Sequence, residues 1–278
     1  MNGKTIVVTG ATSGIGEVAA ETLAAAGARI LFVARDEAKA KALLSRLTRA
    51  NPDATHDFVL ADLSLLAGMK AAAQALLAKT TKLDVLINNA GAIFDRREVT
   101  ADGLERTFAV NHMAYFVVTE LLLPALSSDA RIVSTASTAH GFATLDFDDL
   151  QTTKGYSAFG AYGRSKLCNI LWTRELARRL APAEVTANSL HPGAVNTRFG
   201  DNAKGWLKPV MAVAKRFMIT PVQGADTLIW LASSPEAAGR TGGYWSRRHL
   251  VTPSAAARDQ AAGLRLWRAS ADIAGLPA

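Results

Sequence analysis

The amino-acid sequence predicts an α/β fold, a single doubly wound domain over residues 1–278 with a mostly parallel seven-stranded sheet and helices on both faces. Short apolar runs of strand length alternate along the chain with longer stretches of helical periodicity. This alternation is typical of parallel strands joined by right-handed crossovers. The first strand also leads directly into a glycine-rich turn and a helix, which is how such folds begin a nucleotide site.

Length and composition agree with one large globular domain. Of the 278 residues, 49% are hydrophobic and 20% are charged, so a large core can form. The single cysteine, Cys168, excludes an internal disulfide and is expected to be a packed apolar residue. The net charge of +7 suits an anionic cofactor, and the scattered basic residues argue against nucleic acid. His112, His140 and His191 lack the spacing of metal ligands, so no metal is expected.

The first candidate site is the turn after the first expected strand, Lys4–Thr9. Its glycines let the backbone approach a phosphate, and the helix that follows, expected from Val18 to Ala26, presents a positive N-terminus. We therefore expect it to bind the pyrophosphate of a dinucleotide, the alternative being a tight turn without a ligand. The residues expected to contact the cofactor are Gly10, Thr12, Ser13, Gly14, Ile15 and Gly16.

The end of the second expected strand, Arg29–Ala34, bears on the choice of cofactor. Units specific for NAD usually place an acid there, on the ribose hydroxyls. Here Arg35 follows, and its guanidinium can pair with a 2′-phosphate. Asp36 is the alternative acid, but it begins the next helix, Asp36–Arg49, where an acid is a natural first residue. The sequence thus predicts NADP(H) in preference to NAD(H).

The remaining elements continue the alternation. Further strands are expected at Asp57–Ala61, Leu83–Ile87, Arg131–Thr135, Val185–Leu190 and Gly243–Ser246. Further helices are expected at Leu65–Lys79, Gly103–Leu126, Tyr162–Leu180, Val222–Ser233 and from a Ser254 cap to Trp267. Ligands bind beyond the carboxyl ends of parallel strands, so polar residues that follow the strands should line one rim.

Tyr162 and Lys166 are the candidate catalytic pair. They lie four residues apart, on one face of an expected helix. An ammonium beside a phenol lowers the pKa of the phenol, and a phenol tuned in this way can exchange a proton with a substrate oxygen. Taken alone, such a pair is commonly an ordinary surface tyrosine and lysine, so its meaning depends on the rest of the chain.

Seven motifs in order resemble those of the short-chain dehydrogenase/reductase family, which has a Rossmann fold. They are Thr9-Gly10-x-x-x-Gly14-Ile15-Gly16, Asp62-Leu63, Asn88-Asn89-Ala90-Gly91, Asn111, Ser137, Tyr162-x-x-x-Lys166 and Pro192-Gly193. Within the family the chain resembles the retinol dehydrogenase and WW-domain oxidoreductase branch, through Arg131–Gly141, Ala161–Leu180 and Val251–Arg258.

The resemblance implies a role for each matched residue. Tyr162 would be the general acid/base, and Lys166 would lower its pKa and hydrogen-bond the nicotinamide ribose. Ser137 would hold the substrate oxygen, and Asn111 would keep a water of a proton relay. The remaining residues implied to contact the cofactor are Asp62, Leu63, Asn89, Ala90, Gly91, Pro192, Gly193, Val195 and Thr197.

The activity implied is NADP(H)-dependent interconversion of an alcohol and an aldehyde or ketone on a lipophilic substrate. Two alternatives stay open: a non-catalytic NADP(H)-binding sensor, and a reductase of polar or secondary-metabolite substrates. The apolar and basic segment at about 196–220 is expected to be a lid, a packed helix or a membrane-surface contact.

The remaining expectations concern location and assembly. No stretch is expected to reach the length of a membrane span. The chain begins at its first strand, so the N-terminal anchor common in animal retinol dehydrogenases and a WW domain are both expected to be absent, and a cytoplasmic location is expected. A homo-oligomer is left open.

Overall fold

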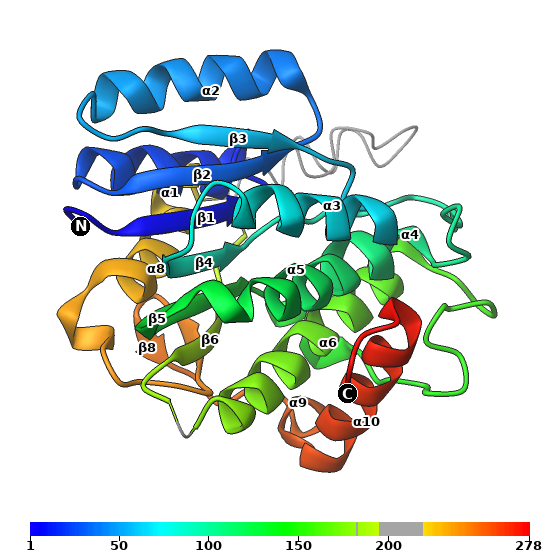
Figure 1. The fold of residues 1–278 in the computed structure, drawn as a ribbon. Coiled ribbons are helices and arrows are strands. Elements are labelled where there is room, and N and C mark those ends of the chain that lie inside the picture. Colours follow the sequence, from blue (N-terminus) through cyan, green and yellow to red (C-terminus); the bar gives the residue numbers. More distant parts are fainter. Residues whose placement is uncertain (182, 195–218) are drawn as a thin grey trace.

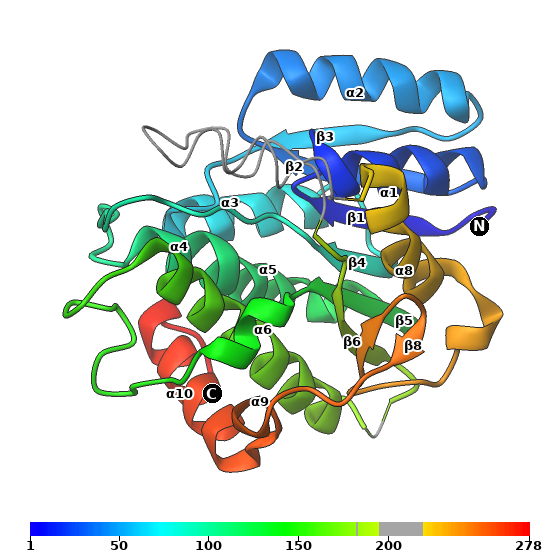
Figure 2. The same ribbon diagram turned by 180° about the vertical axis from the view of Figure 1, so that it is seen from behind.

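The computed structural model describes residues 1–181, 183–194 and 219–278. Within these residues one sheet has the strand order β3-β2-β1-β4-β5-β6-β7-β8, and helices cover both of its faces (Figure 1, Figure 2). Strands β1 to β7 pair in parallel, whereas β8 pairs antiparallel with β7. The predicted fold class is confirmed, and the predicted number of seven strands is corrected to eight.

Most elements lie within a few residues of their expected positions. The strands are β1 Thr5–Thr9, β2 Arg29–Ala34, β3 Asp57–Leu60, β4 Leu83–Asn88, β5 Leu126–Thr135, β6 Thr186–His191, β7 Tyr244–Ser246 and β8 His249–Leu250. The helices include α1 Gly14–Ala25, α2 Glu37–Ala50, α3 Leu66–Leu77, α4 Arg106–Phe108, α5 Ala114–Leu122, α6 Ala158–Arg179, α8 Pro221–Ser233, α9 Ala255–Arg258 and α10 Gln260–Ala274.

The sheet separates two apolar cores. Because successive side chains of a strand point to opposite faces, Ile132 enters the core beneath α3, α5, α6 and α10, and Val133 enters the core beneath α1, α2 and α8. The central strands are buried on both faces, which explains their nearly unbroken apolar sequences.

Two helices differ from the sequence prediction. The single helix expected over Gly103–Leu126 consists of α4, a π-helical turn at Ala109–Met113 and α5. The final helix is divided in two: Ser254 caps only the short α9, and α10 begins afresh at its own cap, Asp259. The π-helical turn and the break between α9 and α10 are local changes of backbone conformation, which the spacing of apolar residues does not predict.

The segment Arg106–Ala125 also corrects the expectation about membrane spans. By length and apolar composition it could cross a membrane, with a mean hydropathy of 1.3 in its most apolar window. However, 72% of that window is buried inside the protein. Its apolar residues pack against α3 and α6 in the core, which accounts for its composition.

Candidate active site

The glycine-rich turn after β1 has the shape of a phosphate cradle. Gly10 and Gly14 have φ angles of 67° and 62°, a region that favours glycine. A Cβ at Gly10 would lie 2.7 Å from the Cα of Ala90, and one at Gly16 would lie 2.3 Å from the carbonyl oxygen of Gly10. Ser13 is the N-cap residue of α1, yet its hydroxyl makes no capping hydrogen bond. The turn therefore fits the pyrophosphate of a dinucleotide, which would lie at the N-terminus of α1 beside Ser13.

Side-chain hydrogen bonds attach this turn to the end of β4. The hydroxyl of Thr9 accepts from the backbone N–H groups of Asn89 and Ala90, at 3.0 and 3.2 Å. The Asn89 side-chain amide donates to the carbonyl of Gly10 at 3.1 Å and accepts from the Thr135 hydroxyl at 3.2 Å. The ends of β1, β4 and β5 are thus held together at one rim of the sheet.

Ser137, Tyr162 and Lys166 meet at that rim. Ser137 follows β5, and α6 carries the other two; Ser157 caps this helix by accepting from the N–H of Gly160. The Lys166 ammonium is buried, donates to the carbonyl of Thr135 at 3.0 Å and lies 5.6 Å from the centre of the Tyr162 ring. The arrangement directs a phenol, a hydroxyl and an amine into one space.

Asn111 lies in the π-helical turn and connects two parts of the site. Its side-chain amide accepts from the N–H of Ala92 at 2.8 Å and donates to the carbonyl of the same residue at 2.9 Å. The amide also donates to the Ser165 hydroxyl, which in turn donates to the carbonyl of Tyr162 at 2.7 Å. Both amide hydrogens are engaged, so a relay water would have to bind a carbonyl oxygen of this turn.

A cavity of about 610 Å³ joins most of the predicted site. The predicted residues that line it are Gly10, Ser13, Gly14, Ile15, Asn89, Ala90, Gly91, Ser137, Tyr162, Lys166, Pro192 and Gly193. Those outside its lining are Thr12, Gly16, Arg35, Asp62, Leu63 and Asn111. Val195, Thr197 and most of the segment at 196–220 lie outside the described residues.

Eight further residues line the cavity and were not predicted. They are Ile93, Thr135, Thr138, Ala139, Phe142, Phe159, His191 and Ala194. Thr135 and His191 could have been found, because Thr135 ends a predicted strand and His191 directly follows one. Phe142 and Phe159 belong to the stretch before Tyr162, which has no periodicity, and only their apolar character in a polar region was a signal.

The comparisons with known proteins agree with this geometry. The family model for short chain dehydrogenases matches residues 4–208. The chain belongs to this family. It is 40% identical to retinol dehydrogenase 14 of Homo sapiens, over 99% of this chain and 88% of that protein. It is 37% identical to the human WW domain-containing oxidoreductase, over 96% of this chain and 67% of that protein.

A solved structure supports the same assignment. The chain is similar to a short chain dehydrogenase from Burkholderia cenocepacia in complex with NADP, with a TM-score of 0.71 and 26% identity over 93% of this chain and 99% of that one. Like other short chain dehydrogenases, the protein is an NAD(P)-dependent oxidoreductase of alcohol and carbonyl groups. In sequence it resembles the retinol dehydrogenase branch, as predicted.

Burial controls the pKa values in this short chain dehydrogenase. It raises the pKa of Tyr162 to about 12, against a smaller lowering by a hydrogen bond with Ser137. It also lowers the pKa of Lys166 to about 7. The net shift of the Tyr162 pKa is thus upward, opposite to the tuning toward neutral pH that was expected from Lys166, because burial outweighs the effects that lower it.

Asp36 and Arg35, which follow the end of β2, have different environments. The Asp36 carboxylate accepts from the N–H of Lys39 at 3.0 Å, and that hydrogen bond holds the pKa of the carboxyl below its usual range. Arg35 is exposed. Burial raises the pKa of Asp62, which lies just after β3, but hydrogen bonds from Ser64 and, to a smaller extent, the charge of Arg35 lower it below its usual range. Asp36 is thus a helix cap, as predicted, and Arg35 follows the carboxyl end of β2 outside the lining of the cavity.

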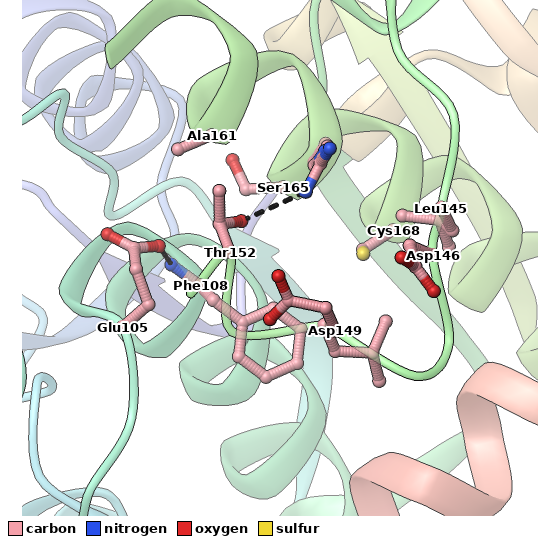
Figure 3. Close-up of a pocket in the computed structure, with 11 residues that line it drawn as sticks. Glu105, Phe108, Leu145, Asp146, Asp149, Thr152, Ala161, Ser165 and Cys168 are labelled. Carbon is pink, nitrogen blue, oxygen red and sulfur yellow. Dashed lines mark hydrogen bonds between the residues drawn. The ribbon is translucent and has the colours of Figure 1, made fainter. Parts of the chain in front are cut away.

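A second, much smaller cavity lies between α4 and α6 (Figure 3). It measures about 10 Å³, enough for at most one water. The Glu105 carboxylate turns away from it to accept from the N–H groups of Thr107 and Phe108. Asp149 accepts from the N–H groups of Thr153 and Lys154. Glu105 thus caps α4 and Asp149 stabilises a loop, and this cavity has no room for a substrate.

Proposed function

We propose that this short chain dehydrogenase interconverts an alcohol and an aldehyde or ketone on a lipophilic substrate and uses NADP(H). The observation that carries the proposal is the convergence of Ser137, Tyr162 and Lys166 in a cavity with an apolar outer wall. Phe142 and Phe159 form that wall, with ring centres 6.2 Å apart and exposed fractions of 84% and 56%. Aromatic side chains this exposed favour an apolar ligand that covers them.

The chemistry follows from the protonation states of the three groups. A bound nicotinamide cofactor supplies or accepts the hydride. Tyr162 stays a phenol at neutral pH because its pKa is raised to about 12, so its hydroxyl can donate a proton to a carbonyl oxygen. The Ser137 hydroxyl holds that oxygen beside Tyr162. Lys166, with a pKa near 7, takes up or releases a proton near neutral pH.

Arg35 supports the preference for NADP(H). It offers a permanent charge, and Ser13 adds a hydroxyl in the adjacent turn. A charge-assisted hydrogen bond contributes about 1.5–3 kcal/mol, or roughly ten- to a hundredfold in affinity. We expect the wild type to prefer NADPH by that factor in kcat/KM, and Arg35→Ala to lose the preference. A wild-type preference for NADH would overturn this part of the proposal.

Asp36→Asn is the matched control for Arg35→Ala. Asparagine is as good an N-cap as aspartate, so this variant keeps α2 capped and removes only the charge. If Asp36 serves only as a cap, use of NADH stays unchanged. A loss of NADH turnover in Asp36→Asn would show that Asp36, rather than Arg35, reads the ribose.

The substrate class can be tested by NADPH consumption. Retinoid, fatty and aromatic aldehydes, quinones and ketosteroids would be compared with polar sugars. We expect turnover among the lipophilic compounds, and a higher KM for them in Phe142→Ala with little change for small aldehydes. Turnover of sugars alone would favour the polar-substrate alternative, and NADPH binding without turnover of any compound would favour the non-catalytic sensor.

A further inference from the structure

A buried histidine touches the backbone of the proposed catalytic serine. His140 lies in the 3-10 turn Thr138–Phe142 directly after Ser137 and is 5% exposed. Its Nδ1 lies 2.6 Å from the carbonyl oxygen of Ser137. Its Nε2 lies 3.1 Å from the backbone nitrogen of Ser254, which caps α9 far along the chain. One ring thus bridges the turn beneath the cavity and the C-terminal region.

The two partners define the tautomer of the ring. The Ser137 carbonyl can only accept, so Nδ1 must carry the hydrogen. The Ser254 N–H can only donate, so Nε2 must present a lone pair. Only the neutral imidazole with its proton on Nδ1 satisfies both, and burial favours this neutral form by lowering the pKa of His140.

Packing keeps the ring in this place. The Tyr244 ring on β7 meets it edge-on with centres 5.0 Å apart. The turn itself presses against α6, since a Cβ at Gly163 would lie 2.9 Å from the carbonyl of Ala139. Gly163 adjoins Tyr162, so a shift of this turn changes the position of Ser137 relative to the phenol.

We propose that His140 is a positioning residue, which holds Ser137 at its working distance from Tyr162 by tying its carbonyl to the backbone of Ser254. This inference rests on the proposed function, because it assumes that Ser137 holds the substrate oxygen. It also gives the segment that enters α9 a part in the reaction, although this segment lies outside the lining of the cavity.

The first test compares two substitutions of His140. His140→Leu keeps an apolar shape and removes both hydrogen bonds, whereas His140→Gln offers an amide donor and an amide acceptor in one plane. We expect kcat in His140→Leu to fall by up to about a hundredfold with an unchanged KM for NADPH, because a misplacement of about 1 Å costs that much. His140→Gln should recover most of it. A glutamine variant no better than leucine would overturn the proposal.

The second test leaves the histidine in place and removes its partner. Ser254 has a φ angle of −54°, which proline can adopt. Ser254→Pro deletes the N–H and the hydroxyl, and Ser254→Ala deletes only the hydroxyl, which accepts from the N–H of Ala257 at 3.3 Å. We expect kcat to fall in Ser254→Pro and to stay near the wild-type value in Ser254→Ala. Equal kcat in the two variants would overturn the tie, even if His140→Leu fails to fold.

Ser137→Ala separates this inference from the function on which it rests. If Ser137→Ala keeps full turnover, the proposed site is wrong and the His140 inference falls with it. If Ser137→Ala is inactive while His140→Leu and Ser254→Pro turn over like the wild type, only the positioning role is wrong.

Discussion

Lys166 is an amine held where its charge is unfavourable. It is 2% exposed, and the hydrogen-bond partner described for its ammonium is the carbonyl of Thr135. Burial without a carboxylate partner favours the neutral amine, and the pKa falls from 10.5 to about 7. The protein therefore keeps this lysine at a cost in stability, which a reaction that needs a proton near neutral pH explains.

We expect Lys166→Met to stabilise the protein and abolish most turnover. The unfolded lysine binds a proton up to its ordinary pKa and the folded one releases it near pH 7, so the penalty shrinks as the pH rises from about 7 to about 10. The gain in the free energy of unfolding should accordingly be largest near neutral pH, on the order of a few kcal/mol. The gain in Tm should follow the same dependence on pH. Thermal unfolding of both proteins across this range provides the measurement. A gain that grows with pH would contradict the burial argument.

Tyr162→Phe should keep the fold and NADPH binding and lose about 10²–10⁴-fold in kcat, because only the transferable proton is removed. Steady-state kinetics and NADPH titration measure the two effects. Wild-type turnover in this variant would exclude Tyr162 as the acid/base.

The direction of the reaction adds a dependence on pH. Alcohol oxidation needs the phenolate, which is scarce below a pKa of about 12. We expect the wild-type oxidation rate to rise from about pH 7 to about pH 10 through deprotonation of Tyr162. In the same range, the phenol needed for carbonyl reduction remains abundant. A rate of oxidation that declines with pH over this range would contradict the assignment.

For single residues, the sequence predicts which side chains form the site better than it predicts their pKa values. The motifs correctly predicted that Ser137, Tyr162 and Lys166 lie close together. Ser137 follows a strand and the other two share one helix face, and both elements reach the same rim of the sheet. The sign of the pKa shift on Tyr162 was predicted wrongly, since it depends on how deeply both groups are enclosed. Enclosure is set by distant parts of the chain.

The π-helical turn is the element that joins the site to the core. Asn111 uses the turn to reach Ala92 and Ser165. On the next residue, the His112 ring lies 2.9 Å from the Ser270 hydroxyl on α10. Asn111 and His112 are polar residues inside an otherwise apolar helical run, and this composition alone predicted one regular helix. π-Helical turns of this kind occur frequently at functional sites.

We expect Asn111→Ala to destabilise the protein by about 1–3 kcal/mol, because the partly buried N–H and carbonyl of Ala92 lose their partner. Ser165→Ala is the control, since it removes only one partner of the amide and should cost less. Urea unfolding of both variants measures the difference. A larger loss of stability in Ser165→Ala than in Asn111→Ala would show that the hydrogen bonds of the Asn111 amide to Ala92 are not what holds this region together.

For the whole molecule, the sheet should insulate its two cores from each other. Ile170 on α6 belongs to one core and Ile30 on β2 to the other. Each Ile→Val change should cost about 0.5–1.5 kcal/mol. We expect the double variant to cost the sum within about 0.5 kcal/mol, because the two sites share no partners. Denaturant unfolding of both single variants and the double variant tests this, and a strongly non-additive double variant would mean that strain crosses the sheet.

The sequence predicted the alternation of parallel strands and helices along the chain and overlooked β8. Alternating apolar runs report strands that are buried, whereas β8 has two residues, both exposed. Proteins of this size depend on buried strands for their cores, so periodicity captured the part of the fold that carries most of the stability. The predictions for Val195, Thr197 and most of the segment at about 196–220 lie outside the described residues and remain predictions.

The β7–β8 hairpin also bears on how this protein behaves in concentrated solution. An open strand at the margin of a sheet is a template onto which another chain can add and start aggregation. Here β8 covers the flank of β7, and Arg248 in the turn pairs with Asp226 and donates its N–H to Thr227, both on α8. A strand of two residues, fastened to a helix and followed by an irregular chain, offers too little backbone for a neighbour to extend the sheet. Loosening it with Asp226→Ala should therefore raise light scattering on storage before it changes the catalytic rate.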